Sequence, residues 1–80
     1  MDAGVAFGRV LRRLRNEAGF TQEELGFEAD LRRTYISILE LGQQQPTLTT
    51  IFNLAKPLKR SAQEIVGLVE TEIHQGRRRR

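Results

Sequence analysis

The sequence contains no cysteine and a single histidine, His74, near its end. Without thiols the chain can form no disulfide, and it has no thiolate to ligate a metal or attack a substrate. One histidine provides no set of metal ligands, and the sequence has neither a glycine-rich phosphate loop nor an HExxH pattern. We therefore expect no metal, no cofactor and no enzymatic activity.

Long apolar runs are also missing. No stretch approaches the ~20 residues that cross a bilayer, and the first residues include Asp2 and lack an apolar signal-like core. We expect a cytoplasmic protein that does not contact membranes. Its 80 residues make one small domain, close to the lower limit for folding alone, so a partner chain would help.

The positive charge is concentrated at one end. The net charge is +3, but Arg77 to Arg80 supply four of the thirteen basic residues, and the rest of the chain carries −1. Nucleic-acid binding would therefore depend on where the other basic residues lie. We expect residues 1–76 to form the domain and residues 77–80 to be a disordered basic tail that is either inert or bound to phosphates.

Two helices are predicted in the first part of the chain. Apolar residues spaced three and four apart indicate a helix over about residues 4–18, ended by Gly19. Thr21 and Glu24 have the spacing of a capping box, which predicts that a second helix begins there and runs to about Ala29.

Three more helices are predicted in the rest of the chain, the first over residues 32–42. Thr47 is a suitable N-cap for a helix over residues 48–58, in which Pro57 should kink or shorten the last turn. Ser61 opens the fifth helix with a second capping box. The expected buried stripe of the fourth helix comprises Leu48, Ile51, Leu54, Ala55 and Leu58.

Residues 22–41 fit a helix-turn-helix pattern. Gly26 is small where the two helices approach most closely, and Asp30 stands in the turn, where glycine is usual but aspartate tolerates a left-handed backbone. The pattern is specific because it requires several residue types at fixed spacing around a short turn. The apolar positions that would bury the two helices against each other are Leu25, Ala29, Leu31, Ile36 and Leu39.

The chain resembles the Cro/repressor-type (XRE) helix-turn-helix family over about residues 7–66, in the strings TQEEL, RRTYIS, LELG, QPTL and IFNLAKPL. Within that family, RTYIS is most similar to the controller proteins of bacterial restriction-modification systems. The resemblance implies an all-α, compact five-helix lambda-repressor-like DNA-binding domain with its helix-turn-helix at about residues 21–42. It also implies a dimeric transcriptional regulator whose third helix enters the major groove and whose fifth contributes to the dimer contact.

The recognition helix of such a protein, here about residues 32–41, presents its N-terminal residues to base edges. Arg33 is placed to bind guanine O6 and N7 with both arms of its guanidinium. Gln22 matches the family position that anchors a phosphate at a helix N-terminus. The expected base contacts are Arg33, Thr34, Tyr35 and Ser37, and the expected DNA backbone contacts are Gln22, Arg32, Gln43, Gln44 and Thr47.

Three residues of the third helix leave alternatives open. Tyr35 could fill the core instead of touching DNA. Ile38, where the family usually carries a polar or small residue, either contacts a thymine methyl group or turns toward the protein. Glu40 is expected to be structural, paired with a first-helix arginine such as Arg12 or Arg13.

The fifth helix carries more apolar residues than one narrow stripe requires, and a symmetric dimer would bury the excess. The alternative is that all of them belong to the core of one chain. The expected dimer interface comprises Ile65, Leu68, Val69 and Ile73.

These features predict a homodimeric, sequence-specific regulator that binds a roughly palindromic double-stranded DNA operator, including one at its own promoter. Such a protein would repress or, through contact with RNA polymerase, activate. The alternative function is an antitoxin or adaptor in which the same fold binds a protein.

Overall fold

Five helices make up the part of the chain that the computed structural model describes, which is residues 1–78, with side chains for residues 1–76. They are α1 (Ala3–Glu17), α2 (Gln22–Ala29), α3 (Arg33–Glu40), α4 (Leu48–Leu58) and α5 (Ala62–Arg78). Those residues contain no strand, so the prediction of an all-α fold is confirmed. None of the described helices is long and apolar enough to span a bilayer.

Side-chain caps fix where the helices begin. The Thr21 hydroxyl accepts a hydrogen bond from the Glu24 amide at 3.0 Å, and the Glu24 carboxylate accepts one from the Thr21 amide at 2.8 Å. Ser61 and Glu64 form the same reciprocal pair, with distances of 3.0 and 2.9 Å. Both predicted capping boxes are confirmed, and each satisfies two amides that the helix itself leaves without partners.

The helix ends depend on left-handed residues. Gly19, after α1, has φ +80°, as its predicted role requires. Asp30 ends α2 with φ 58° and Lys59 ends α4 with φ 56°, so both adopt a conformation that costs an ordinary side chain about 1 kcal/mol. Pro57 was expected to kink or shorten the last turn of α4. The helix ends at Leu58, as predicted, so Pro57 does not shorten it.

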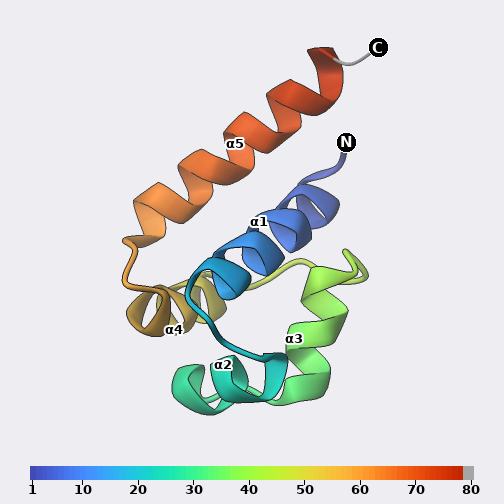
Figure 1. Ribbon diagram of the computed structural model, residues 1–80. Coiled ribbons are helices and arrows are strands. Elements are labelled where there is room, and N and C mark those ends of the chain that lie inside the picture. The colour runs from blue at the N-terminus through green and yellow to red at the C-terminus, as the bar shows by residue number, and fades with distance from the viewer. Residues whose placement is uncertain (79–80) are drawn as a thin grey trace.

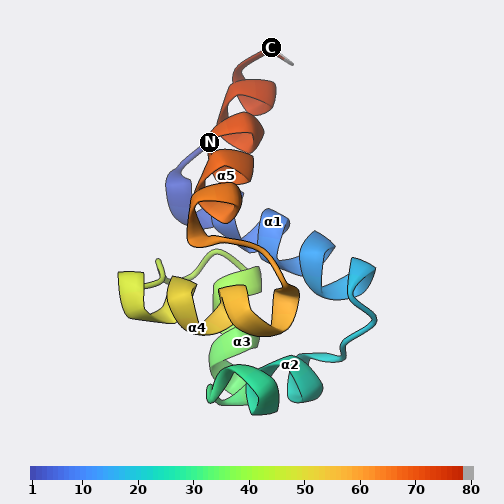
Figure 2. The same ribbon diagram turned by 90° about the vertical axis from the view of Figure 1, so that its left-hand side faces the viewer.

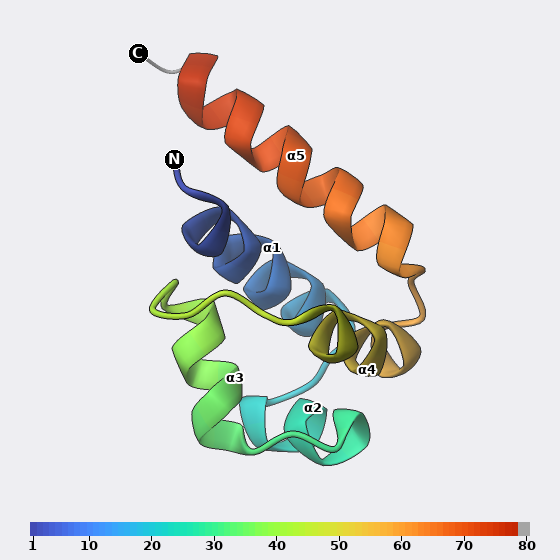
Figure 3. The ribbon, with the colours of Figure 1, turned by 180° about the vertical axis from the view of Figure 1, so that it is seen from behind.

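The helices surround α1 (Figure 1). This helix packs against α3 and α5, while α2 packs against α3 and α4. The side view and the rear view show α5 as an outer layer at one end of the molecule, with α2 and α3 at the opposite end (Figures 2 and 3). The largest side chains with almost no exposed surface are Leu11, Leu25, Ile36, Leu39, Leu54 and Val10.

Two predictions about packing and helix length are wrong. Leu48, expected in the buried stripe of α4, is 72% exposed, because it is the first residue of the helix and lies at the side of the stripe formed by Ile51 and Leu54. The tail was expected from residue 77, but α5 continues to Arg78. The disorder expected for residues 79–80 lies outside the described residues.

Candidate nucleic-acid interface

The helix-turn-helix formed by α2 and α3 is closely packed at its turn. A methyl group on Gly26 would lie 2.6 Å from the Leu31 carbonyl oxygen, so only glycine fits there without a shift of the backbone. The Leu31 amide donates to the Gly26 carbonyl at 2.7 Å, and the left-handed Asp30 makes this reversal possible. The roles predicted for Gly26 and Asp30 are therefore confirmed.

A buried polar cluster, which we call the clamp, joins α3 to the rest of the domain. Arg15 donates to both carboxylate oxygens of Glu40, at 2.6 and 3.1 Å, and to the Phe20 carbonyl at 2.9 Å. The Gln22 amide donates to Glu40 at 3.1 Å. The Glu40 carboxylate thus connects the end of α3 with α1 and the start of α2, and Arg15 extends the cluster to the α1–α2 loop.

The clamp corrects the expected partner of Glu40. The predicted partners, Arg12 and Arg13, are exposed, whereas the side chains of Arg15 and Glu40 are only 12% and 5% exposed. The position of Arg15 four residues after the buried Leu11 was the available signal, because that spacing places both on one face of α1. The hydrogen bond to Glu40 raises the pKa of the Arg15 guanidinium, so this side chain stays a cation wherever the protein is folded.

The outer side of α3 carries most of the residues expected to contact bases. Arg33 and Thr34 are exposed, and Ser37 is half-buried. Tyr35 is also half-buried and its ring packs against the core, so a contact with DNA could come only from the exposed part of this side chain. Arg32 is exposed at the N-cap position, where it forms no side-chain cap among the described contacts.

The residues expected to contact the DNA backbone differ in exposure and in the hydrogen bonds that they already form within the chain. Gln43 and Gln44 are exposed in the connection that runs between α3 and α4 (Figure 3). The Thr47 hydroxyl caps α4, since it accepts from the Thr50 amide at 3.1 Å and bonds the Thr50 hydroxyl at 3.0 Å. Gln22 is half-buried in the clamp, yet a primary amide has two N–H donors and Glu40 uses one.

Exposed apolar side chains are found on α4 and α5. Leu48 and Phe52, one turn apart on α4, are 72% and 60% exposed, and Val66 on α5 is 46% exposed. Val66 also borders a groove of about 160 Å³, whose lining comprises Ala3, Phe7, Gln45, Pro46, Ile51, Val66 and Val69.

The residues expected at a dimer interface are only partly available. Ile65 is 2% exposed and belongs to the core of the single chain, because it faces inward from the first turn of α5. Leu68, Val69 and Ile73 are half-buried. Phe52 was missed by sequence reasoning, although its position four residues after Leu48 was the signal that both lie on one face.

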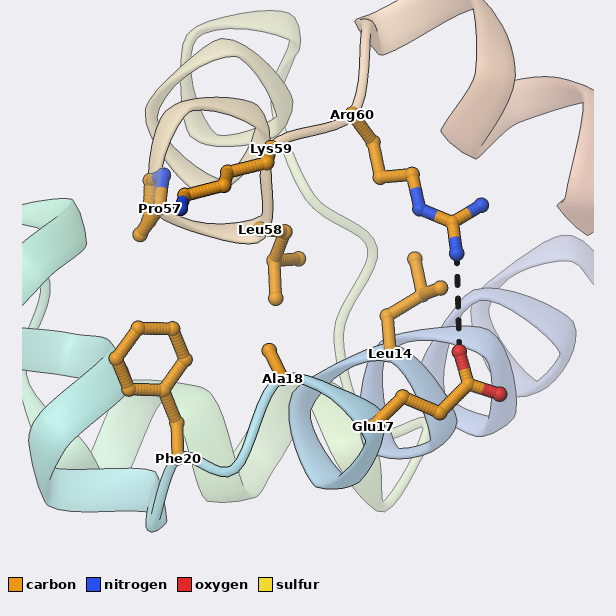
Figure 4. A pocket seen from close by; sticks show the side chains of 8 residues that line it. All are labelled: Leu14, Glu17, Ala18, Phe20, Pro57, Leu58, Lys59 and Arg60. Atoms are coloured by element: carbon orange, nitrogen blue, oxygen red, sulfur yellow. Dashed lines mark ion pairs between the residues drawn. The ribbon is translucent and has the colours of Figure 1, made fainter.

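A larger pocket of about 350 Å³ lies between the end of α1 and the end of α4 (Figure 4). Phe20, Pro57 and Leu58 give it an apolar lining, and an ion pair of 3.7 Å between Arg60 and Glu17 stands at one edge. Its charged groups are at the rim and exposed or half-buried, so the pocket offers no buried polar group that would orient a ligand.

Comparison with known proteins agrees with this geometry. A family model described as helix-turn-helix matches residues 11–65. The chain is 39% identical over 66 residues to an uncharacterised HTH-type transcriptional regulator, y4dJ, of Sinorhizobium fredii, covering 82% of this chain and 86% of the relative. It is 42% identical over 53 residues to the control protein C.BamHI of Bacillus amyloliquefaciens, which is 65% of each protein.

A solved structure supports the same assignment. The restriction-modification controller protein C.AhdI from Aeromonas hydrophila superimposes with a TM-score of 0.73 and 39% identity, covering 76% of this chain and 92% of that one. The family match extends from α1 into α5 and includes the whole helix-turn-helix. The chain belongs to the XRE-type helix-turn-helix family of transcriptional regulators, and within it is similar to the restriction-modification control proteins.

Proposed function

We propose that this protein binds a roughly palindromic DNA operator as a homodimer, with α3 of each copy in the major groove. The observation that carries the proposal is the contrast between the two sides of α3. Ile36 and Leu39 are 0% exposed on the inner side, whereas Arg33 and Thr34 are exposed on the outer side. The helix is therefore held firmly by one side and leaves the other open to the groove.

Base reading is assigned to the exposed N-terminal half of α3. Arg33 would donate two hydrogen bonds to guanine, which discriminates against other bases by about 1 to 3 kcal/mol. Thr34 and Ser37 would donate or accept at neighbouring base edges, with a smaller part for the Tyr35 hydroxyl. Arg32, at the start of the helix, would bind a phosphate.

Contacts with the DNA backbone would hold α3 in register. Gln22 would use its second N–H for a phosphate, with its amide oriented by Glu40. Gln43 and Gln44 would donate from the connection between α3 and α4. Because the Thr47 hydroxyl already caps α4, we assign the contact at that point to the free backbone amides of the first turn of α4.

The apolar surface of α4 and α5 is assigned to the second copy of the chain. Leu48, Phe52 and Val66 would form its centre, with contributions from Val69 and Ile73, since the exposed part of these side chains is apolar. A two-fold axis through this surface would separate the two recognition helices by about 34 Å, one turn of DNA.

Regulation would follow from occupancy of the operator. A dimer bound beside a promoter, its own included, would block RNA polymerase or contact it and assist it. Binding would then respond to protein concentration, because dimerisation and operator binding both obey mass action.

The test is the affinity of the purified protein for DNA. A preferred duplex is selected from a random library, and fluorescence anisotropy compares it with a scrambled duplex and with the sequence upstream of the gene, at two salt concentrations. We expect at least ~10³-fold preference over the scrambled duplex. Equal, weak and steeply salt-dependent binding to every duplex would mean that the arginines supply only attraction to phosphates, and would favour an antitoxin or adaptor.

A further inference from the structure

We propose that Ile38 and Leu41 read the methyl groups of thymines, so that the operator half-site contains thymines beside the guanine bound by Arg33. This inference rests on the proposed function, in which the outer side of α3 enters the major groove. It concerns the second half of that helix, where the polar residues end and the outer side becomes apolar.

The helical spacing places both residues on the outer side. Leu41 follows Thr34 by seven residues, which is almost two complete turns, so the two side chains point in nearly the same direction. Ile38 follows Thr34 by four residues and lies on the same stripe. Leu41 keeps helical backbone angles, φ −81° and ψ −5°, so the stripe extends one residue beyond the last helical position.

Burial supports this placement. Leu41 is 65% exposed, so most of its side chain is open to contact from outside the domain. Ile38 is half-buried, and the half-buried apolar side chains that pack against the core cluster near the helix-turn-helix are Phe20, Leu31 and Tyr35. By its spacing from Thr34, Ile38 lies on the outer side of α3, where it presents the exposed part of a half-buried side chain.

The open side of α3 is visible in the fold. The helix packs against α1 and α2, and it stands at the edge of the bundle, where none of the other described helices lies on its outer side (Figure 1). From Thr34 to Leu41 the rise along the helix is about 10 Å, close to the length of three base-pair steps. The apolar stripe can thus reach bases beyond the one read by Arg33.

The chemistry of the groove selects the ligand. Thymine presents a C5 methyl group in the major groove, whereas cytosine, adenine and guanine present hydrogen-bonding groups that an isoleucine or leucine cannot satisfy. Burying an apolar side chain against those polar groups would leave them without partners. Apolar contact with a methyl group gains about fourfold in affinity, the amount expected for burying one such group.

The experiment removes the methyl groups from the DNA and the apolar groups from the protein separately. Each thymine of the selected duplex is replaced in turn by deoxyuridine, which pairs identically but lacks the methyl. Anisotropy then measures the thymine-to-uracil affinity ratio for the wild type, Ile38→Ala and Leu41→Ala. We expect a ratio of about four at one or more positions per half-site for the wild type, and a ratio near one at distinct positions in each variant.

Phe27→Ala is the matched control. It removes an aromatic side chain that is 84% exposed on α2, and it should keep the wild-type ratio at every position. The ratio is taken within one protein preparation, so a loss of folded protein in a variant leaves it unchanged.

Three outcomes would overturn the inference in different ways. If uracil leaves wild-type affinity unchanged while the selected duplex is still preferred over the scrambled one, thymine reading is wrong and the proposed function stands. If both alanine variants keep the wild-type ratio, another residue contacts the methyl groups. If the wild type prefers no duplex, the proposed function fails first and the inference fails with it.

Discussion

The clamp and the apolar surface of α4 and α5 are stabilised in opposite ways. Around Glu40, directional hydrogen bonds join three helices, and every buried side-chain nitrogen and oxygen of the described residues has a partner. On α4 and α5, Phe52 and Leu48 leave large apolar groups in contact with water. The first region is complete within one chain, whereas the second gains most from another surface. The difference teaches that the proposed DNA-reading helix is fixed by polar contacts within the chain, whereas the proposed dimer surface is apolar and without such contacts.

Removing the clamp carboxylate should have the largest effect. Glu40→Ala leaves the Arg15 guanidinium buried without its counter-charge, which we expect to lower the free energy of unfolding by about 3 kcal/mol. Thermal unfolding followed by circular dichroism measures the loss. Arg60→Ala is the control, because it breaks an exposed pair of 3.7 Å and should cost less than about 1 kcal/mol. Equal effects of the two variants would contradict the inference that the buried clamp stabilises the domain more than the exposed ion pair does.

Placing a charge on the apolar surface should break association without unfolding the chain. Phe52→Asp would put a carboxylate at the centre of the proposed dimer, so we expect a monomer by light scattering and a loss of about a hundredfold in operator affinity. Phe27→Asp makes the same change on α2 and should leave the dimer intact. A dimeric Phe52→Asp variant would show that the two copies meet elsewhere.

The next effect separates base reading from phosphate binding. Arg33→Ala should flatten the preference at one base per half-site, a loss of about 1 to 3 kcal/mol in discrimination. Gln22→Ala should weaken binding to selected and scrambled duplexes alike, measured by anisotropy against a set of single-base variants. If Arg33→Ala lowers affinity equally for all of them, its assignment to base reading is wrong.

The smallest effect concerns the start of α5. The hydrogen bond from the Ser61 amide lowers the pKa of the Glu64 carboxyl below its ordinary 4.5, helped by the Ser61 hydroxyl and Arg60. A carboxyl with a lowered folded pKa contributes stability above its ordinary pKa and loses it as the pH falls through the folded value. Glu64→Gln should therefore lower the melting temperature slightly at pH 7 and hardly at all near pH 3. An equal decrease at both values would contradict this linkage.

The helices were largely predictable because their signals are local. The capping boxes at Thr21 and Ser61, and the glycine at position 19, act over a few residues, so their spacing in the chain is enough. The partner of Glu40 was not predictable with the same certainty, since it depends on how α1 is rotated against α3. The expected partners, Arg12 and Arg13, lie on the correct helix, α1, but the observed partner, Arg15, lies on a different face of it.

The burial of Leu48 and Ile65 was also not predictable from sequence periodicity alone. Leu48 and Ile65 are both aliphatic residues in the first turn of a helix, yet one is 72% exposed and the other 2%. Sequence periodicity gives a face of a helix, but the extent to which a neighbouring helix covers that face depends on tertiary packing.

Replacing the left-handed Lys59 is a way to raise the stability of the domain for protein engineering. It ends α4 with φ 56°, is exposed, and caps a helix far from the outer side of α3. Glycine would relieve a backbone cost of about 1 kcal/mol at this position, part of which is offset by greater freedom of the unfolded chain. A library that reprogrammes the specificity of α3 could start from a Lys59→Gly background, in which substitutions too destabilising for the natural chain are more easily tolerated.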